Sequence, residues 1–127
     1  MSVMGRFIEQ AIKVKPLKAY GNRTRKRSLT YVSATVNTIL LLIRGRRSGE
    51  IYNVGNDQEA AIIDLTKLIL EIIGSNAKVK FLLLPPFDSM IRSADITKLK
   101  ALGFNHEVSL NNGLKRWSKR MSQIVNK

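Results

Sequence analysis

The chain has 127 residues, of which 44% are hydrophobic and 24% are charged, a composition typical of one folded globular domain and unlike that of a disordered segment. It contains no cysteine and a single histidine, which excludes disulfides and the usual Cys/His zinc sites and permits a reducing, cytoplasmic compartment. Twenty-two Lys and Arg residues against nine Asp and Glu residues give a net charge of +13, which favours anionic partners.

The first predicted element is an amphipathic helix over about residues 3–14. Its apolar residues recur at intervals of three and four, and Pro16 stops it because proline cannot continue a helix. Two short β-prone runs follow at 17–20 and 28–32, on either side of a turn and a strongly basic loop. They predict two short strands with positive charge between them.

The middle of the chain predicts two longer helices with a strand between them. The first helix runs from an N-cap at Ser33 to a stop signal at Gly45, and the second covers about 63–73. A short strand is expected at 51–54, and it leads into a polar connection. After the second helix, a strand-like run at 78–84 predicts a further strand.

Two more helices are predicted towards the end of the chain. Asp95 caps a short helix over about 96–102, and Ser109 opens a final amphipathic helix. Short strands therefore alternate with four or five helices, too few strands for a complete doubly wound nucleotide-binding sheet. The prediction is a single small α+β domain over residues 1–127. No apolar run reaches the roughly 18 residues that a membrane-spanning helix requires.

Six short motifs follow one another along almost the whole chain. In order they are Pro16-Leu17 with Tyr20-Gly21, Arg27-Ser28, Tyr31-Val32, Asn53-Val54-Gly55-Asn56, Arg92 with Asp95-Ile96, and Leu102-Gly103-Phe104. Each motif alone is weak, but their common order and spacing are specific. By these motifs the chain resembles the C-terminal substrate domain of the extended short-chain dehydrogenase/reductase family, with a pattern like that of UDP-glucuronate decarboxylases and their epimerase and dehydratase relatives.

The resemblance implies a role for five residues. Arg27 and Arg92 would hold the diphosphate of a UDP- or dTDP-sugar, and Leu17 and Tyr20 would border the nucleobase pocket. Asn53 would help to shape the domain beside that pocket. The chemistry agrees, because two guanidinium groups from separate loops can neutralise a diphosphate, each charge-assisted hydrogen bond contributing about 1.5 to 3 kcal/mol.

The chain lacks the elements that the family uses for chemistry. There is no Gly-rich dinucleotide-binding turn, and the residues four positions after the tyrosines are Thr24, Thr35 and Asn56, so no Tyr-x-x-x-Lys pair exists. No catalytic, cofactor-binding or metal-binding residue is therefore assigned. The resemblance implies that NAD belongs to the complete family enzyme, in a separate dinucleotide-binding domain. We expect this chain to bind a nucleotide-sugar and to be inactive alone.

The basic residues leave two other interpretations open. Residues 15–27 carry more positive charge than the family pattern, including Arg23, Arg25 and Lys26, and residues 44–47 add a second cluster. Such clusters bind nucleic-acid phosphates without sequence preference, so the alternative is a basic nucleic-acid-binding module on a relic scaffold. A third interpretation is self-association through apolar surface that a missing domain would otherwise cover.

Overall fold

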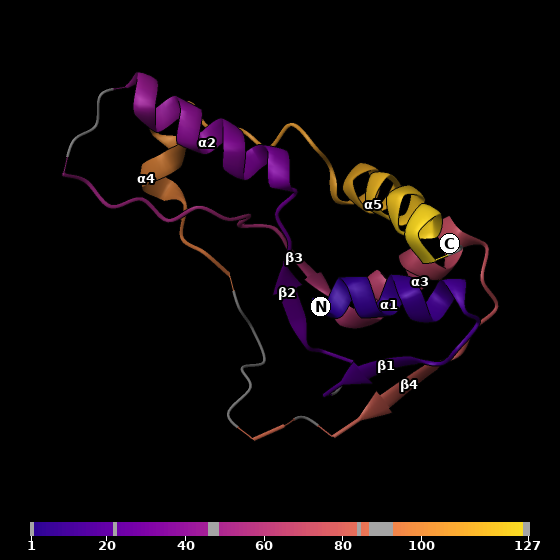
Figure 1. The fold of residues 1–127 in the computed structure, drawn as a ribbon. Helices are drawn as coiled ribbons and strands as arrows, with labels where there is room; N and C mark the ends of the chain where they lie inside the picture. The colour runs from indigo at the N-terminus through magenta and orange to yellow at the C-terminus, as the bar shows by residue number, and fades with distance from the viewer. Residues whose placement is uncertain (1, 22, 46–48, 84, 87–92, 126–127) are drawn as a thin grey trace.

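The structure is a computed structural model, and it describes residues 2–21, 23–45, 49–83, 85–86 and 93–125. These residues form five helices and four short strands, which confirms the α+β prediction (Figure 1). In chain order the elements are α1 (Val3–Ile12), β1 (Leu17–Tyr20), β2 (Lys26–Ser28), α2 (Val32–Arg44), β3 (Glu59–Ala61), α3 (Ile62–Ile73), β4 (Val79–Leu82), α4 (Thr97–Lys100) and α5 (Leu110–Val125).

The main core lies between α1, α3 and α5, which pack against one another (Figure 1). The apolar stripe of α1, at spacings of three and four residues, is buried along its whole length: Met4, Phe7, Ile8 and Ala11. The same cluster takes in buried residues from the other elements: Leu17, Ala19, Ile62, Leu65, Ile69, Ala77 and Leu114. Two short strand pairs border this three-helix core.

The strands form two separate pairs. β1 runs parallel to β4, with Leu17 opposite Val79, while β2 runs antiparallel to β3, with Arg27 opposite Ala60. The parallel pair needs a long crossover, and α2, β3 and α3 all lie between its two strands in the chain. Because β3 ends at Ala61 and α3 begins at Ile62, the antiparallel pairing places β2 next to the start of α3.

Two predictions of secondary structure are wrong in detail. Residues 51–54 form no strand, and Ile51 is 86% exposed, because no neighbouring strand pairs with this segment in the described structure. The strand expected at 28–32 lies earlier, as β2, and the following helix begins sooner than predicted. The N-cap of α2 is therefore Tyr31 rather than Ser33, and no side-chain hydrogen bond caps it.

A smaller lobe, formed by α2, α4 and the segments that join them to the core, lies apart from the three-helix group (Figure 1). Its own buried cluster consists of Ala34, Ile96, Leu99 and Phe104. The opposite face of α2 keeps a row of exposed apolar side chains: Val32, Val36, Ile39, Leu40 and Ile43. No helix in the described ranges has the length and apolar character that crossing a membrane requires.

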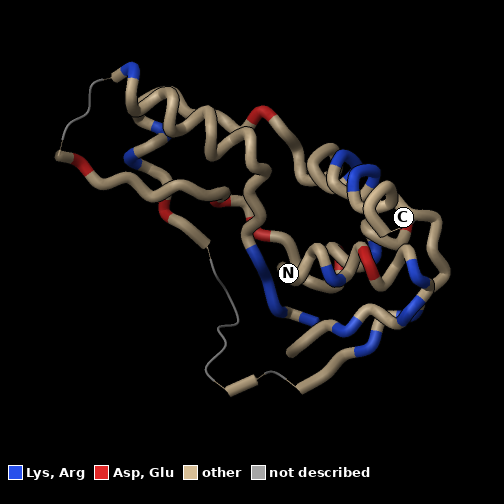
Figure 2. Tube along the Cα trace, in the orientation of Figure 1, with Lys and Arg blue, Asp and Glu red and all other residues tan. Residues whose placement is uncertain are grey.

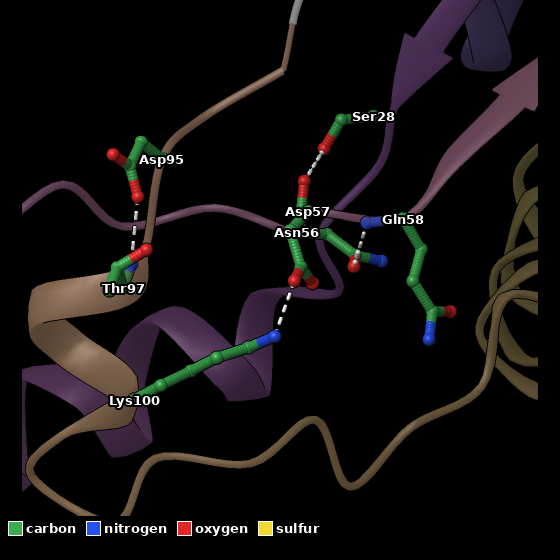
Figure 3. A network of polar contacts seen from close by, with 7 residues as sticks. All are labelled: Ser28, Asn56, Asp57, Gln58, Asp95, Thr97 and Lys100. Carbon is green, nitrogen blue, oxygen red and sulfur yellow. Dashed lines mark hydrogen bonds and ion pairs between the residues drawn. The ribbon is translucent and has the colours of Figure 1, made fainter.

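A polar network joins the smaller lobe to the β2–β3 pair (Figure 3). The Ser28 hydroxyl donates to the backbone carbonyl of Asn56, and the Asn56 side-chain amide donates to the carbonyl of Leu29 (3.0 Å). On the other side of this segment, Lys100 of α4 forms an ion pair with Asp57. Asn56 and Asp57, shortly before β3, thus contact both the β2–β3 pair and the smaller lobe.

The Lys100–Asp57 pair carries a testable pKa prediction. The hydrogen bond from Lys100 holds the pKa of the Asp57 carboxyl below its ordinary value. Because the pKa of Asp57 is lower in the folded state, the pair with Lys100 stabilises the fold above the ordinary aspartate pKa. This stabilisation is lost as the pH falls through the pKa that Asp57 has in the folded state. Replacing Lys100 with methionine is expected to return the pKa of Asp57 towards its ordinary value, as measured by pH titration of the carboxyl carbon resonance.

The control for this measurement lies two residues before α4. The pKa of the Asp95 carboxyl is lowered by hydrogen bonds from Thr97, whose amide lies 2.9 Å from an Asp95 carboxylate oxygen. Lys100 takes no part in those hydrogen bonds, so the titration of Asp95 is expected to stay the same in the Lys100→Met variant. An Asp57 titration that the substitution leaves unchanged would contradict the assignment.

Candidate functional site

The described residues surround a cavity of about 320 Å³ at the start of α1. Its wall combines the first turn of α1, the end of β1, the strand β2 with the residues on either side of it, and side chains from α3 and α5. The apolar lining residues are Val3, Met4, Phe7, Leu29, Ile62 and Trp117, and the polar ones are Ser2, Tyr20, Arg25, Arg27, Ser28 and Thr30. None of these lining residues is acidic, so the cavity favours an anionic or neutral ligand.

Arg25, just before β2, and Lys26 and Arg27 within it lie on an extended stretch of chain. Successive side chains of a strand point to opposite faces, so Arg25 and Arg27 share one face and Lys26 takes the other. Arg25 and Arg27 accordingly line the cavity, whereas the Lys26 ammonium lies 3.6 Å from the Glu59 carboxylate on the outside. The Lys26 side chain is thus directed away from the cavity, and those of Arg25 and Arg27 are directed towards it.

Both arginine side chains donate hydrogen bonds to nearby backbone carbonyls. The Arg25 side chain is only 6% exposed, and its Nη1 donates to the carbonyl of Tyr20 (3.0 Å). Its backbone carbonyl accepts a hydrogen bond from the Ile62 amide (2.8 Å) at the start of α3. The Nη1 of Arg27, a half-buried residue, donates to the carbonyl of Lys26 (2.8 Å). These bonds fix the end of β1 to β2 and β2 to the core.

The structure brings together two of the five residues that the resemblance selected. Tyr20 and Arg27 line the same cavity, although seven positions separate them in the chain. Asn53 lies elsewhere, with an exposed side chain whose amide donates to the backbone carbonyl of Asp95 (3.2 Å). Arg92 falls outside the described residues, so the proposed clamp of Arg27 with Arg92 remains a prediction.

Leu17 lies in the core, and its expected position beside the nucleobase stays a prediction. It is 0% exposed and belongs to the main core, and it does not line the cavity. In this structure Leu17 anchors β1 in the main core.

Arg25 is the residue of this site that the sequence interpretation missed. It had been grouped with Arg23 and Lys26 as surplus charge in a loop. The three side chains have different surroundings in the structure. The Arg23 guanidinium lies 5.7 Å from the centre of the Phe81 ring, Lys26 pairs with Glu59, and Arg25 is buried. A register that placed Arg25 and Arg27 on one strand face would have identified it.

Basic residues also lie outside the cavity. Figure 2 shows Lys and Arg residues along the chain through β1 and β2, and more of them on α5. Acidic residues interrupt this distribution at few points in the same region. In the described parts of the chain, no three His, Cys, Asp or Glu side chains come close enough together to hold a metal ion.

Comparisons with known proteins show what the whole chain is similar to. No protein-family model matches the chain. It is 36% identical over 124 residues to UDP-glucuronic acid decarboxylase 4 of Arabidopsis thaliana, an alignment that covers 97% of this chain and 28% of that protein. The chain therefore spans a little over a quarter of the length of this relative.

Solved structures give the same result for the fold. UDP-glucuronic acid 4-epimerase of Bacillus cereus, solved with UDP-glucuronic acid and NAD, superposes with a TM-score of 0.89 at 28% identity, over 97% of this chain and 40% of that one. A dTDP-glucose 4,6-dehydratase of Streptomyces venezuelae, solved with NAD, has a TM-score of 0.80 at 26% identity, over 93% and 37%. In sequence and in fold, the chain therefore belongs with the C-terminal portion of the extended short-chain dehydrogenases/reductases, which include nucleotide-sugar epimerases, dehydratases and decarboxylases.

Proposed function

We propose that this chain is a nucleotide-sugar-binding domain, and that the cavity at the start of α1 holds the nucleotide part of a UDP- or dTDP-sugar. The observation that carries the proposal is that Tyr20 and Arg27 line one cavity, whose described lining residues include Arg25 and no acidic residue. Arg27 binds the diphosphate through its planar fork of donors, and Tyr20 borders the nucleobase. Arg92 would add a second guanidinium from its own segment.

The proposed role is binding and orientation rather than bond making. A dinucleotide is typically held by a Gly-rich turn at the edge of a multi-stranded parallel sheet, and the described strands form only two pairs. We assign none of the described residues to NAD or to catalysis. Epimerisation, dehydration or decarboxylation would therefore require a separate dinucleotide-binding domain, against which this domain positions the sugar.

Calorimetric titration of the 127-residue chain tests the proposal. UDP-glucuronate and UDP are expected to bind with similar affinity, because the recognised groups are the nucleobase and the diphosphate. Uridine is expected to bind at least roughly tenfold more weakly, since it lacks the charge-assisted contacts of the diphosphate. Absence of UDP binding at millimolar concentration would refute the proposed function.

The Lys and Arg residues along β1, β2 and α5 (Figure 2) favour nucleic-acid binding as a second candidate function. The two candidates differ in their dependence on salt. A strand that contacts six or more cations loses affinity with a slope of about −0.7 per phosphate contact in log K against log salt, whereas two contacts with a diphosphate give a shallow slope. Tight, steeply salt-dependent binding of single-stranded RNA or DNA, together with no binding of UDP, would select the nucleic-acid interpretation.

A further inference from the structure

Arg25 lies outside every motif by which the chain resembles its family, yet it is the most deeply buried charged residue described in the cavity wall. Its exposed fraction is 6%, and it stands two positions before Arg27 on the same face of the extended chain. The family motif gives a role to Arg27 and none to Arg25. The role of Arg25 is therefore inferred from its position in the structure.

We propose that Arg25 is a second anion-binding residue of the cavity, and that Arg25 and Arg27 together hold the diphosphate of a nucleoside diphosphate ligand. This inference rests on the proposed function and adds a residue to it. It also narrows the ligand class: the pair selects a group with two negative charges in adjacent phosphates over a monophosphate or a neutral nucleoside.

The electrostatics of the cavity support this pairing. Both guanidinium groups line the same cavity, so their positive charges act together on a ligand that contacts both. A diphosphate carries negative charge on two adjacent phosphates and matches this pair. The apolar residues around the site, such as Phe7, Ile62 and Trp117, lower the local dielectric constant and strengthen hydrogen bonds between a guanidinium and a phosphate.

The fixed position of Arg25 supports the same conclusion. Its hydrogen bond to the Tyr20 carbonyl and the bond from Ile62 to its own carbonyl hold the residue between β1 and α3. A guanidinium held in this way loses little conformational freedom when a ligand binds. Tyr20, which borders the proposed nucleobase position, is held by the same contact, so one residue links the base and the diphosphate.

The test compares Arg25→Gln, Arg25→Lys and the control Lys26→Gln in calorimetric titrations with UDP and with uridine. Lys26→Gln removes the same charge one position away, but from the outer face. We expect Arg25→Gln to weaken UDP binding at least roughly tenfold, the loss of a charge-assisted hydrogen bond, and to leave uridine binding unchanged. Arg25→Lys keeps the charge but loses the fork, so UDP binding is expected to fall less.

Each outcome of this test has a definite meaning. If Arg25→Gln weakens UDP and uridine binding equally, Arg25 only supports the pocket through Tyr20 and the inference is wrong. If Lys26→Gln weakens UDP binding as much as Arg25→Gln, the effect is one of net charge and the inference is also wrong. If the wild-type chain does not bind UDP, the proposed function itself is wrong, before any variant is compared. Circular dichroism melting identifies a misfolded variant, and Arg25→Lys then decides: unchanged UDP affinity in that variant would overturn a role for the fork.

Discussion

Replacing Leu17 with alanine is expected to lower the free energy of unfolding by about 2 to 5 kcal/mol, the range for a large-to-small change in a packed core. Leu17 is 0% exposed and packs into the main cluster from the first position of β1. Truncation removes apolar contacts and leaves a cavity that the three-helix core can fill only in part. Urea unfolding at equilibrium, followed by circular dichroism, measures the change.

Leu83 provides the matched control for this substitution. It lies one residue after β4, the strand that pairs with β1, and it is 94% exposed. Leu83→Ala removes the same atoms from water-exposed surface and is expected to change the unfolding free energy by less than about 0.5 kcal/mol. Equal effects of the two substitutions would contradict the core position of Leu17.

The Leu17→Ala variant also separates a structural role from a ligand contact. Because Leu17 has no accessible surface, the folded fraction of the variant is expected to bind UDP with the wild-type affinity within a factor of about two, well below the tenfold effect of 1.4 kcal/mol. The resemblance placed Leu17 at the nucleobase pocket. A selective loss of UDP affinity in a variant that remains folded would restore that placement.

Replacing Arg27 with glutamine is expected to weaken UDP and UDP-glucuronate binding by roughly 10- to 150-fold, which corresponds to the 1.5 to 3 kcal/mol of a charge-assisted hydrogen bond. Arg27 lies on a strand whose register with β3 is set by main-chain bonds, so its guanidinium is directed to the cavity before a ligand arrives. Glutamine keeps much of the length and the polarity but loses the charge and the fork. Calorimetric titration at constant ionic strength gives the two affinities.

Lys26→Gln is the control for Arg27→Gln as well. The two substitutions remove equal charge from adjacent residues of β2, one on each face of the strand. The proposal requires that only the Arg27 change affects binding of the nucleotide by more than a few fold. Similar losses in both variants would mean that the diphosphate responds to the general positive field of the loop, and Arg27 would no longer be a specific ligand.

Local patterns were sufficient to predict the elements that depend on neighbours in the chain. The strand at 17–20 agrees with β1 at both ends, and the helix expected at 3–14 agrees with α1 within two residues. The helix expected at 63–73 agrees with α3, and Gly74 after it has a φ of 69°, the left-handed conformation that glycine adopts at helix ends. Helical periodicity and end signals carry this information within one segment.

Features that depend on distant partners were not predictable in the same way. Residues 51–54 have β-prone side chains but find no neighbouring strand in the described structure, while the polar segment that begins at Glu59 becomes β3 because it pairs with β2. The burial of Arg25 has the same origin. Its position follows from the register of β2 and from the contact with Tyr20, which a single sequence does not reveal.

The central claim is that the cavity at the start of α1 binds the nucleotide of a nucleotide-sugar. The most direct measurement is a titration of the isotopically labelled chain with UDP-glucuronate, followed by the backbone amide chemical shifts of every assigned residue. The account predicts that the largest shifts occur at Tyr20, Arg25, Arg27 and Ser28, with small changes on the exposed face of α2. The claim would be contradicted if no amide shifts at millimolar ligand, or if the shifts are confined to the Lys and Arg residues of α5.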